Sequence, residues 1–128
     1  MMHRFPIRVY YEDTDLAGIV YYANYLKFIE RARSEWVREL GIDQVRMKAD
    51  GLVFAVRRVE ADYLVPAKYD DELVVHTTMQ PGSGARLVVK QNVMRGDTLL
   101  FSALVTIICM TLDGAVSRLP AVIRRSMP

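Results

Sequence analysis

The spacing of apolar residues changes only once along the chain. Between Tyr25 and Leu40 they recur at steps of three and four, which places them on one face of an α-helix. Asn24 is a suitable N-cap residue, and Gly41 suits the left-handed position that follows a last helical turn. The pattern therefore predicts one long helix with a single apolar face. The members of that face are Tyr25, Phe28, Ile29, Ala32, Trp36 and Leu40.

Elsewhere apolar and polar residues alternate, which is the period of a half-buried strand. In the first such segment Ile7, Val9 and Tyr11 share a face. The last segment is apolar on both faces, as expected of a central strand. Short connections at 81–84 and 95–98 indicate that the four strands after the helix form an antiparallel meander. The five expected strands cover residues 5–11, 59–65, 73–79, 87–93 and 99–110.

These elements predict an α+β fold in which one long helix packs on a five-stranded antiparallel sheet. The length of 128 residues corresponds to one domain, residues 1–128. A single long helix covers only one face of the sheet, and the two-sided apolar strand at 99–110 needs a second cover. Since no second long helix is available, we expect a further copy of the chain to supply it, which makes the protein a homo-oligomer.

Charge and composition exclude several classes of protein. Lys and Arg number 17 and Asp and Glu 15, a balance that disfavours nucleic-acid binding. The single cysteine, Cys109, forbids an internal disulfide or a cysteine zinc cage, and two histidines disfavour a histidine metal site, so we expect no metal and no cofactor. Residues 1–9 lack the apolar core of a signal peptide, and the apolar run 99–112 is shorter than the roughly 20 residues of a membrane span. A cytoplasmic location is expected.

The most distinctive local feature is an acidic loop directly before the helix. Glu12, Asp13 and Asp15 fall within four positions, and Gly18 allows the chain to turn with positive φ. The free N–H groups of a helix start favour negative charge and can hold an oxyanion. A carboxylate beside such an oxyanion hole is a minimal acyl-transfer site. The alternative is that these carboxylates merely cap the helix or form the turn.

The sequence of this loop resembles that of the hotdog-fold acyl-CoA thioesterases of the 4-hydroxybenzoyl-CoA thioesterase type. Within that family it resembles the branch associated with the Tol–Pal envelope system. The matching run is Tyr11-Glu12-Asp13-Thr14-Asp15, then Gly18, Val20, Tyr21, Asn24 and Tyr25. Further matches are Glu30-Arg31-Ala32-Arg33, Val56-Arg57-Arg58, Tyr63, Pro66-Ala67 and Asp70-Asp71. The resemblance extends in order over about residues 7 to 120.

The resemblance implies that Asp15 is the catalytic carboxylate and that the backbone N–H of Tyr22 polarises the thioester carbonyl. This role requires either that the helix begins before Asn24 or that Tyr22 donates from an irregular first turn. The residues expected to bind substrate are Gly18, Ile19, Val20, Tyr21, Asn24, Arg57 and Arg58, with Phe54 as a further wall of an apolar slot. Arginines suit the phosphates of CoA, and Lys68, Arg86 and Lys90 are other candidates.

We therefore expect an enzyme that hydrolyses the thioester of a small aliphatic or aromatic acyl-CoA, with Asp15 as nucleophile or general base. The alternative is a non-catalytic module that binds acyl-CoA or acyl carrier protein within an envelope or lipid-synthesis complex. A hotdog dehydratase is disfavoured, since it needs a histidine in the site and neither His3 nor His76 lies in the loop. Relatives of this type are commonly dimers of dimers, which implies a homotetramer.

Overall fold

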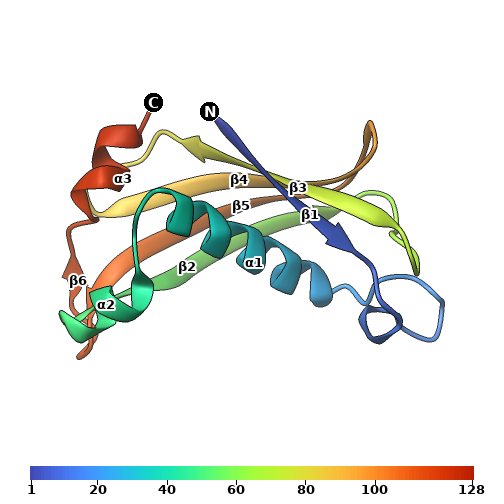
Figure 1. Ribbon diagram of the computed structural model, residues 1–128, viewed down its shortest axis with the longest axis horizontal. Helices are drawn as coiled ribbons and strands as arrows, with labels where there is room; N and C mark the ends of the chain where they lie inside the picture. The colour runs from blue at the N-terminus through green and yellow to red at the C-terminus, as the bar shows by residue number, and fades with distance from the viewer.

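The computed structural model describes every residue of the chain, 1–128. Six strands form one antiparallel sheet, and the long helix α1 (Asn24–Glu39) crosses one face of it (Figure 1). This arrangement confirms the predicted α+β fold of one long helix on an antiparallel sheet. The strands are β1 (Met2–Arg8), β2 (Leu52–Tyr63), β3 (Glu72–Gln80), β4 (Arg86–Arg95), β5 (Thr98–Thr111) and β6 (Val116–Ser117).

The strand order is β1-β3-β4-β5-β2, with β6 paired to the end of β5. The meander prediction is correct for β3, β4 and β5 but wrong for β2, which pairs with β5 at the edge opposite β1. The reason is the connection at residues 64–71, which is longer than a hairpin turn and crosses the end of the sheet. Leu64 and Val65 donate N–H groups to Leu100 O on the way.

The core lies between α1 and the sheet. The predicted helical stripe is buried from Tyr25 to Trp36, while Leu40 is only half-buried. Gly41 adopts a φ of +87°, as expected for the residue that ends the helix. Facing α1, the strands contribute alternate apolar residues together with the only two buried polar side chains, Thr77 and Gln91. The helix packs mainly on β1 and β3, which leaves β2 beside it and less covered.

The first strand ends earlier than predicted. Val9 is buried, but Tyr11 is 83% exposed and lies in a 3₁₀ turn, η1 (Tyr11–Asp13), instead of on the face shared with Ile7. The chain leaves the sheet because the Asp13 carboxylate accepts the N–H of Tyr10 at 2.8 Å. This turn starts the acidic loop and therefore matters for the site.

Three short elements were missing from the prediction. The helix α2 (Gln44–Ala49) begins at Asp43, whose carboxylate accepts the N–H groups of Val45 and Arg46. The helix α3 (Ala121–Ser126) follows Pro120 and buries Ile123, and β6 extends the sheet from five strands to six. None of the helices is long and apolar enough to cross a membrane.

Candidate active site

The acidic loop uses two of its side chains to fix its own shape. Asp13 Oδ2 accepts the N–H of Tyr10, and Thr14 Oγ1 donates to Tyr11 O at 2.7 Å. Glu12 is exposed and forms no hydrogen bond within the chain. The turn-forming role that the sequence left open is therefore taken by Asp13.

Asp15 sits on the next turn and keeps one carboxylate oxygen free. Its Oδ1 accepts the N–H of Ala17 at 2.9 Å, its backbone N–H donates to Ile19 O, and its carbonyl accepts from Gly18. Gly18 closes the turn with a φ of +78°, a conformation that side-chain-bearing residues rarely adopt. The Asp15 side chain is exposed and lines an open recess of about 580 Å³ whose other walls are Tyr11, Thr14, Leu16, Gly18 and Tyr69.

The loop is tied to the start of α1 through the backbone of Asp13. Its carbonyl accepts both the N–H of Tyr21 and the side-chain amide of Asn24, each at 2.9 Å. The expected N-cap at Asn24 is therefore wrong, because the N-cap position is Ala23 and the Asn24 amide is used to hold the loop. Asn24 thus positions the loop, and its expected contact with substrate stays a prediction.

Tyr22 occupies an irregular turn just before α1, which is the second of the two arrangements that its predicted role allows. The backbone N–H groups of Tyr22 and Ala23 donate to no acceptor within the chain. The next N–H, that of Asn24, donates to Tyr21 O. Two adjacent donors at the helix start are therefore available to an oxygen from outside.

An apolar groove of about 260 Å³ adjoins Tyr22. Tyr63 crosses its end and donates its hydroxyl to Tyr22 O at 3.1 Å. Burial raises the pKa of the Tyr63 phenol, so this donor stays protonated at neutral pH. Tyr25 and Tyr63 were not among the predicted site residues, although both belong to apolar periodicities. The groove is lined by Ile19, Val20, Tyr22, Tyr25, Tyr63, Leu64, Val65 and Pro66.

The recess of Asp15 and the groove of Tyr22 lie on either side of one short stretch of backbone. Gly18 lines the first and Ile19 the second, and no residue lines both. Within one chain the Asp15 carboxylate makes no hydrogen bond to the backbone at the N-terminus of α1. The space where a Gly18 side chain would stand is open, with no atom within 4 Å.

The remaining predicted residues are dispersed. Ile19 and Val20 line the groove, and the ring of Tyr21 lies beside that of Tyr22 with their centroids 5.0 Å apart. Arg57 sits at a bulge of β2 without a strand partner, and Arg58 forms an exposed ion pair with Glu60 at 3.2 Å. Neither arginine lines the recess of Asp15 or the groove of Tyr22.

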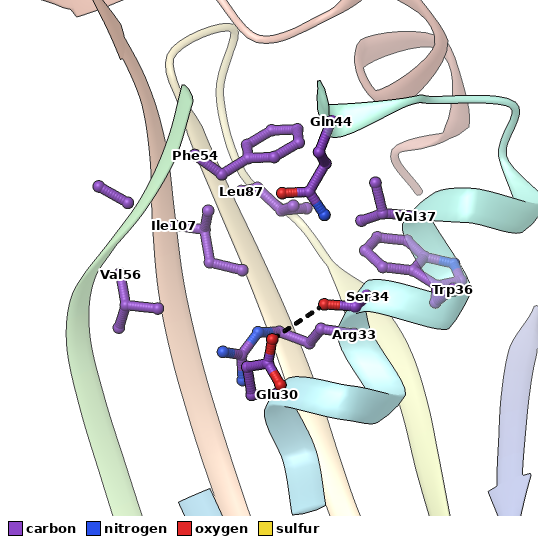
Figure 2. Close-up of a pocket in the computed structure, with 11 residues that line it drawn as sticks. Glu30, Arg33, Ser34, Trp36, Val37, Gln44, Phe54, Val56, Leu87 and Ile107 are labelled. Carbon is purple, nitrogen blue, oxygen red and sulfur yellow. Dashed lines mark hydrogen bonds between the residues drawn. The ribbon is translucent and has the colours of Figure 1, made fainter. Parts of the chain in front are cut away.

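Phe54 lies in another cavity altogether, between α1 and β2 (Figure 2). Cys109 is fully buried, and burial raises the pKa of its thiol, as expected of a core residue. Nowhere in the structure do three His, Cys, Asp or Glu side chains gather as metal ligands would.

Both the sequence and the fold of the chain are similar to those of known thioesterases. Residues 17–102 match the model of a family described as "Thioesterase superfamily". The chain is 44% identical to the "Acyl-CoA thioesterase YbgC" of Haemophilus influenzae over 84% of this chain and 80% of that protein. It is 40% identical to the "Acyl-CoA thioester hydrolase YbgC" of Escherichia coli, over 85% and 82%. A crystal structure of a probable thioesterase from Bartonella henselae superposes with a TM-score of 0.89 at 38% identity, over 94% of this chain and all of that one.

Proposed function

Because the chain belongs to the thioesterase superfamily, we propose that it hydrolyses the thioester of an aliphatic or aromatic acyl-CoA with Asp15 and the N–H of Tyr22 as catalytic groups. The family and the hotdog fold confirm the resemblance noted in the sequence. The curated relatives that share at least 40% of their residues with it over most of both chains are named for acyl-CoA thioester hydrolysis. The protein is accordingly an acyl-CoA thioester hydrolase, which favours turnover over the alternative of a binding module.

The observation that carries the assignment of Asp15 is its exposed carboxylate, which lines an open recess on a turn bound to the helix start. Each of the two aspartates accepts one backbone N–H, but Asp15 is exposed towards the recess, while Asp13 is only partly exposed and does not line it. The N–H groups of Tyr22 and Ala23 supply the complementary donors. A base or nucleophile together with backbone donors is what acyl transfer from a thioester requires.

Either of two routes fits these groups. As general base, Asp15 takes a proton from water while the water oxygen bonds to the thioester carbon; the C–S bond then breaks, and the proton passes to the CoA thiolate. As nucleophile, the Asp15 carboxylate displaces the thiolate to give a mixed anhydride, which water then splits to the free acid and the aspartate. In both routes the N–H of Tyr22 donates to the oxygen that gains negative charge.

The open space beside Gly18 would let one thioester contact both the Asp15 carboxylate and the N–H of Tyr22. A substrate that enters the groove of Tyr22 and crosses the backbone at Gly18 and Ile19 reaches the Asp15 recess without meeting a side chain at Gly18. We propose Ile19, Val20 and Tyr21 as acyl contacts, because the first two line the groove and the ring of Tyr21 lies beside that of Tyr22. Arg57 and Arg58 are proposed as contacts for the CoA phosphates, because both are exposed. An acyl carrier protein remains the alternative donor of the acyl group.

A second copy of the chain is part of the proposal. The sheet face opposite α1 has no cover, and Leu104 in its central strand β5 is 39% exposed. Exposed apolar surface of this kind on a central strand favours association of copies, and the proposed state is a homotetramer.

The assignment is tested by release of free thiol from acyl-CoA. We expect Asp15→Asn to lower kcat/KM by at least about a hundredfold, because removing a general base or nucleophile costs that much or more. Asp13→Asn is the matched control, since an amide oxygen can still accept the N–H of Tyr10. Full activity of Asp15→Asn, or equal losses in both variants, would contradict the role of Asp15.

The role of the Tyr22 backbone has its own pair of variants. Tyr22→Pro removes the N–H donor, whereas Tyr22→Phe keeps it and deletes only the phenol oxygen. We expect a large fall in kcat for the proline variant alone. A comparable fall for Tyr22→Phe would point to the phenol instead of the backbone.

A further inference from the structure

A cavity of about 190 Å³ lies between the second half of α1 and the first half of β2, apart from the recesses of Asp15 and Tyr22 (Figure 2). Its walls are mainly apolar side chains from α1 and from three strands, namely Trp36, Val37, Phe54, Val56, Leu87 and Ile107. Its polar lining residues are Glu30, Arg33 and Ser34 of α1 and Gln44 of α2, and Arg33 is the one positive charge among them.

Arg33 carries a half-buried positive charge with only a neutral partner. Its Nη1 donates to Gln91 Oε1 at 3.0 Å, and the Gln91 amide in turn donates to Ile29 O and Thr77 Oγ1, both at 2.9 Å. No carboxylate lies within 4.0 Å of the guanidinium, since Glu30 is exposed and accepts from Ser34. Burial lowers the pKa of Arg33, and Glu30 opposes this only in part. A charge held in apolar surroundings calls for an anion.

An apolar strip connects this cavity with the groove of Tyr22. Along β2 the residues facing the helix side are all apolar or aromatic, and they stay partly exposed because α1 packs over β1 and β3. The strip ends at Tyr63, whose ring meets that of Tyr22 with centroids 6.1 Å apart. Its members are Phe54, Val56, Val59, Ala61 and Tyr63. At 1.5 Å per helical residue, Arg33 lies about 14 Å along α1 from its first residue, Asn24, a length that an extended medium-length or long fatty chain can span.

We propose that Arg33 binds a carboxylate at the far end of the acyl group, so that the preferred substrates are ω-carboxyacyl-CoAs of medium to long chain. This inference rests on the proposed function and narrows its substrate class. The apolar strip accommodates the methylene chain, and the four N–H donors of Arg33 that Gln91 leaves free can hold a carboxylate with two parallel hydrogen bonds.

The first test compares substrates on the unaltered protein. Thiol release is measured for sebacoyl-, dodecanedioyl- and hexadecanedioyl-CoA and for decanoyl-, dodecanoyl- and hexadecanoyl-CoA. For at least one chain length we expect kcat/KM of the dicarboxylic member to exceed that of its plain partner by about tenfold or more, the effect of one charge-assisted hydrogen bond. Preference for the plain acyl-CoA at every length would overturn the inference.

The second test assigns the preference to Arg33. Arg33→Met keeps side-chain length without charge and is expected to abolish the preference; Arg31→Met, on the exposed face of the same helix, is the matched control. Gln91→Glu is an independent variant that keeps Arg33 but gives it an internal carboxylate partner, and it should reduce the same ratio. An unchanged ratio in both variants at the Arg33 site would contradict the inference.

These outcomes separate the two proposals. Hydrolysis of plain acyl-CoAs that depends on Asp15 but shows no dicarboxylic preference overturns only the role of Arg33. Failure to hydrolyse any of the six thioesters overturns the proposed function and this inference together.

Discussion

Replacement of Gln91 by methionine should destabilise the protein because the Gln91 side chain, on β4, forms buried hydrogen bonds to both α1 and β3. Its side chain is fully buried and makes three hydrogen bonds, one of them to the charged Arg33. Methionine fills a similar volume, so the packing changes little and the polar loss dominates. Two neutral hydrogen bonds contribute about 1 kcal/mol each and one to a charged group about 1.5–3 kcal/mol, so we expect Gln91→Met to cost about 4 kcal/mol.

The assay is urea unfolding at fixed protein concentration, since association of copies would otherwise shift the midpoint. Lys90→Met, at the exposed neighbouring position of β4, is the control and should change stability by less than about 0.5 kcal/mol. The double variant Arg33→Met with Gln91→Met should cost less than the sum of the two single variants, because neither then leaves a buried partner unpaired. A cost for Gln91→Met no larger than that of Lys90→Met would refute the reasoning.

Three further predictions concern other parts of the molecule. Gly18→Ala meets no neighbouring atom but must adopt a φ of +78°, so it should lower stability by about 1 kcal/mol in thermal unfolding and reduce kcat/KM by displacing Asp15. Burial alone would raise the pKa of Asp71, but the N–H of Lys68 and the Arg95 guanidinium outweigh it and hold that pKa below its usual range. Because the pKa of Asp71 is lower in the folded state, Asp71→Asn should destabilise the protein by about 1 kcal/mol above about pH 5. The difference between the two proteins should vanish as the pH falls through the ordinary aspartate pKa of about 3.9 and below the folded-state pKa, which unfolding measured as a function of pH checks. Light scattering coupled to gel filtration should give a tetramer mass that falls in Leu104→Glu, and a monomer of the unaltered chain at every concentration would refute the oligomer proposal.

Local periodicity was sufficient to predict the elements that carry the core. The three-and-four spacing from Tyr25 to Trp36 located α1, and alternation located the strands, because both periods follow from burial of one face. The pairing of β2 with β5 was not predictable in this way, since it depends on contacts such as Phe54 with Cys109, far apart in the chain. The start of α2 had a local signal in Asp43, an N-cap residue, but the helix is too short for a clear period.

The site was predictable only as a region. The sequence places three carboxylates in one loop but cannot show that Asp13 holds the turn at Tyr10 while Asp15 lines an open recess. The Asn24 side chain was predicted to cap the helix, whereas its amide donates to the Asp13 carbonyl across the loop. The sequence places Arg33 on the charged face of the helix and cannot show its contact with Gln91, because Gln91 comes from a strand distant in the chain.

The most direct test of the catalytic arrangement is a crystal structure of the Asp15→Asn variant with an intact acyl-CoA bound. We expect the thioester carbonyl oxygen to lie about 2.7–3.1 Å from the backbone nitrogen of Tyr22, with the side chain at position 15 on the other side of the carbonyl carbon, across the open space beside Gly18. A thioester bound away from both groups, or a Tyr22 N–H that donates to the protein in the complex, would contradict the account.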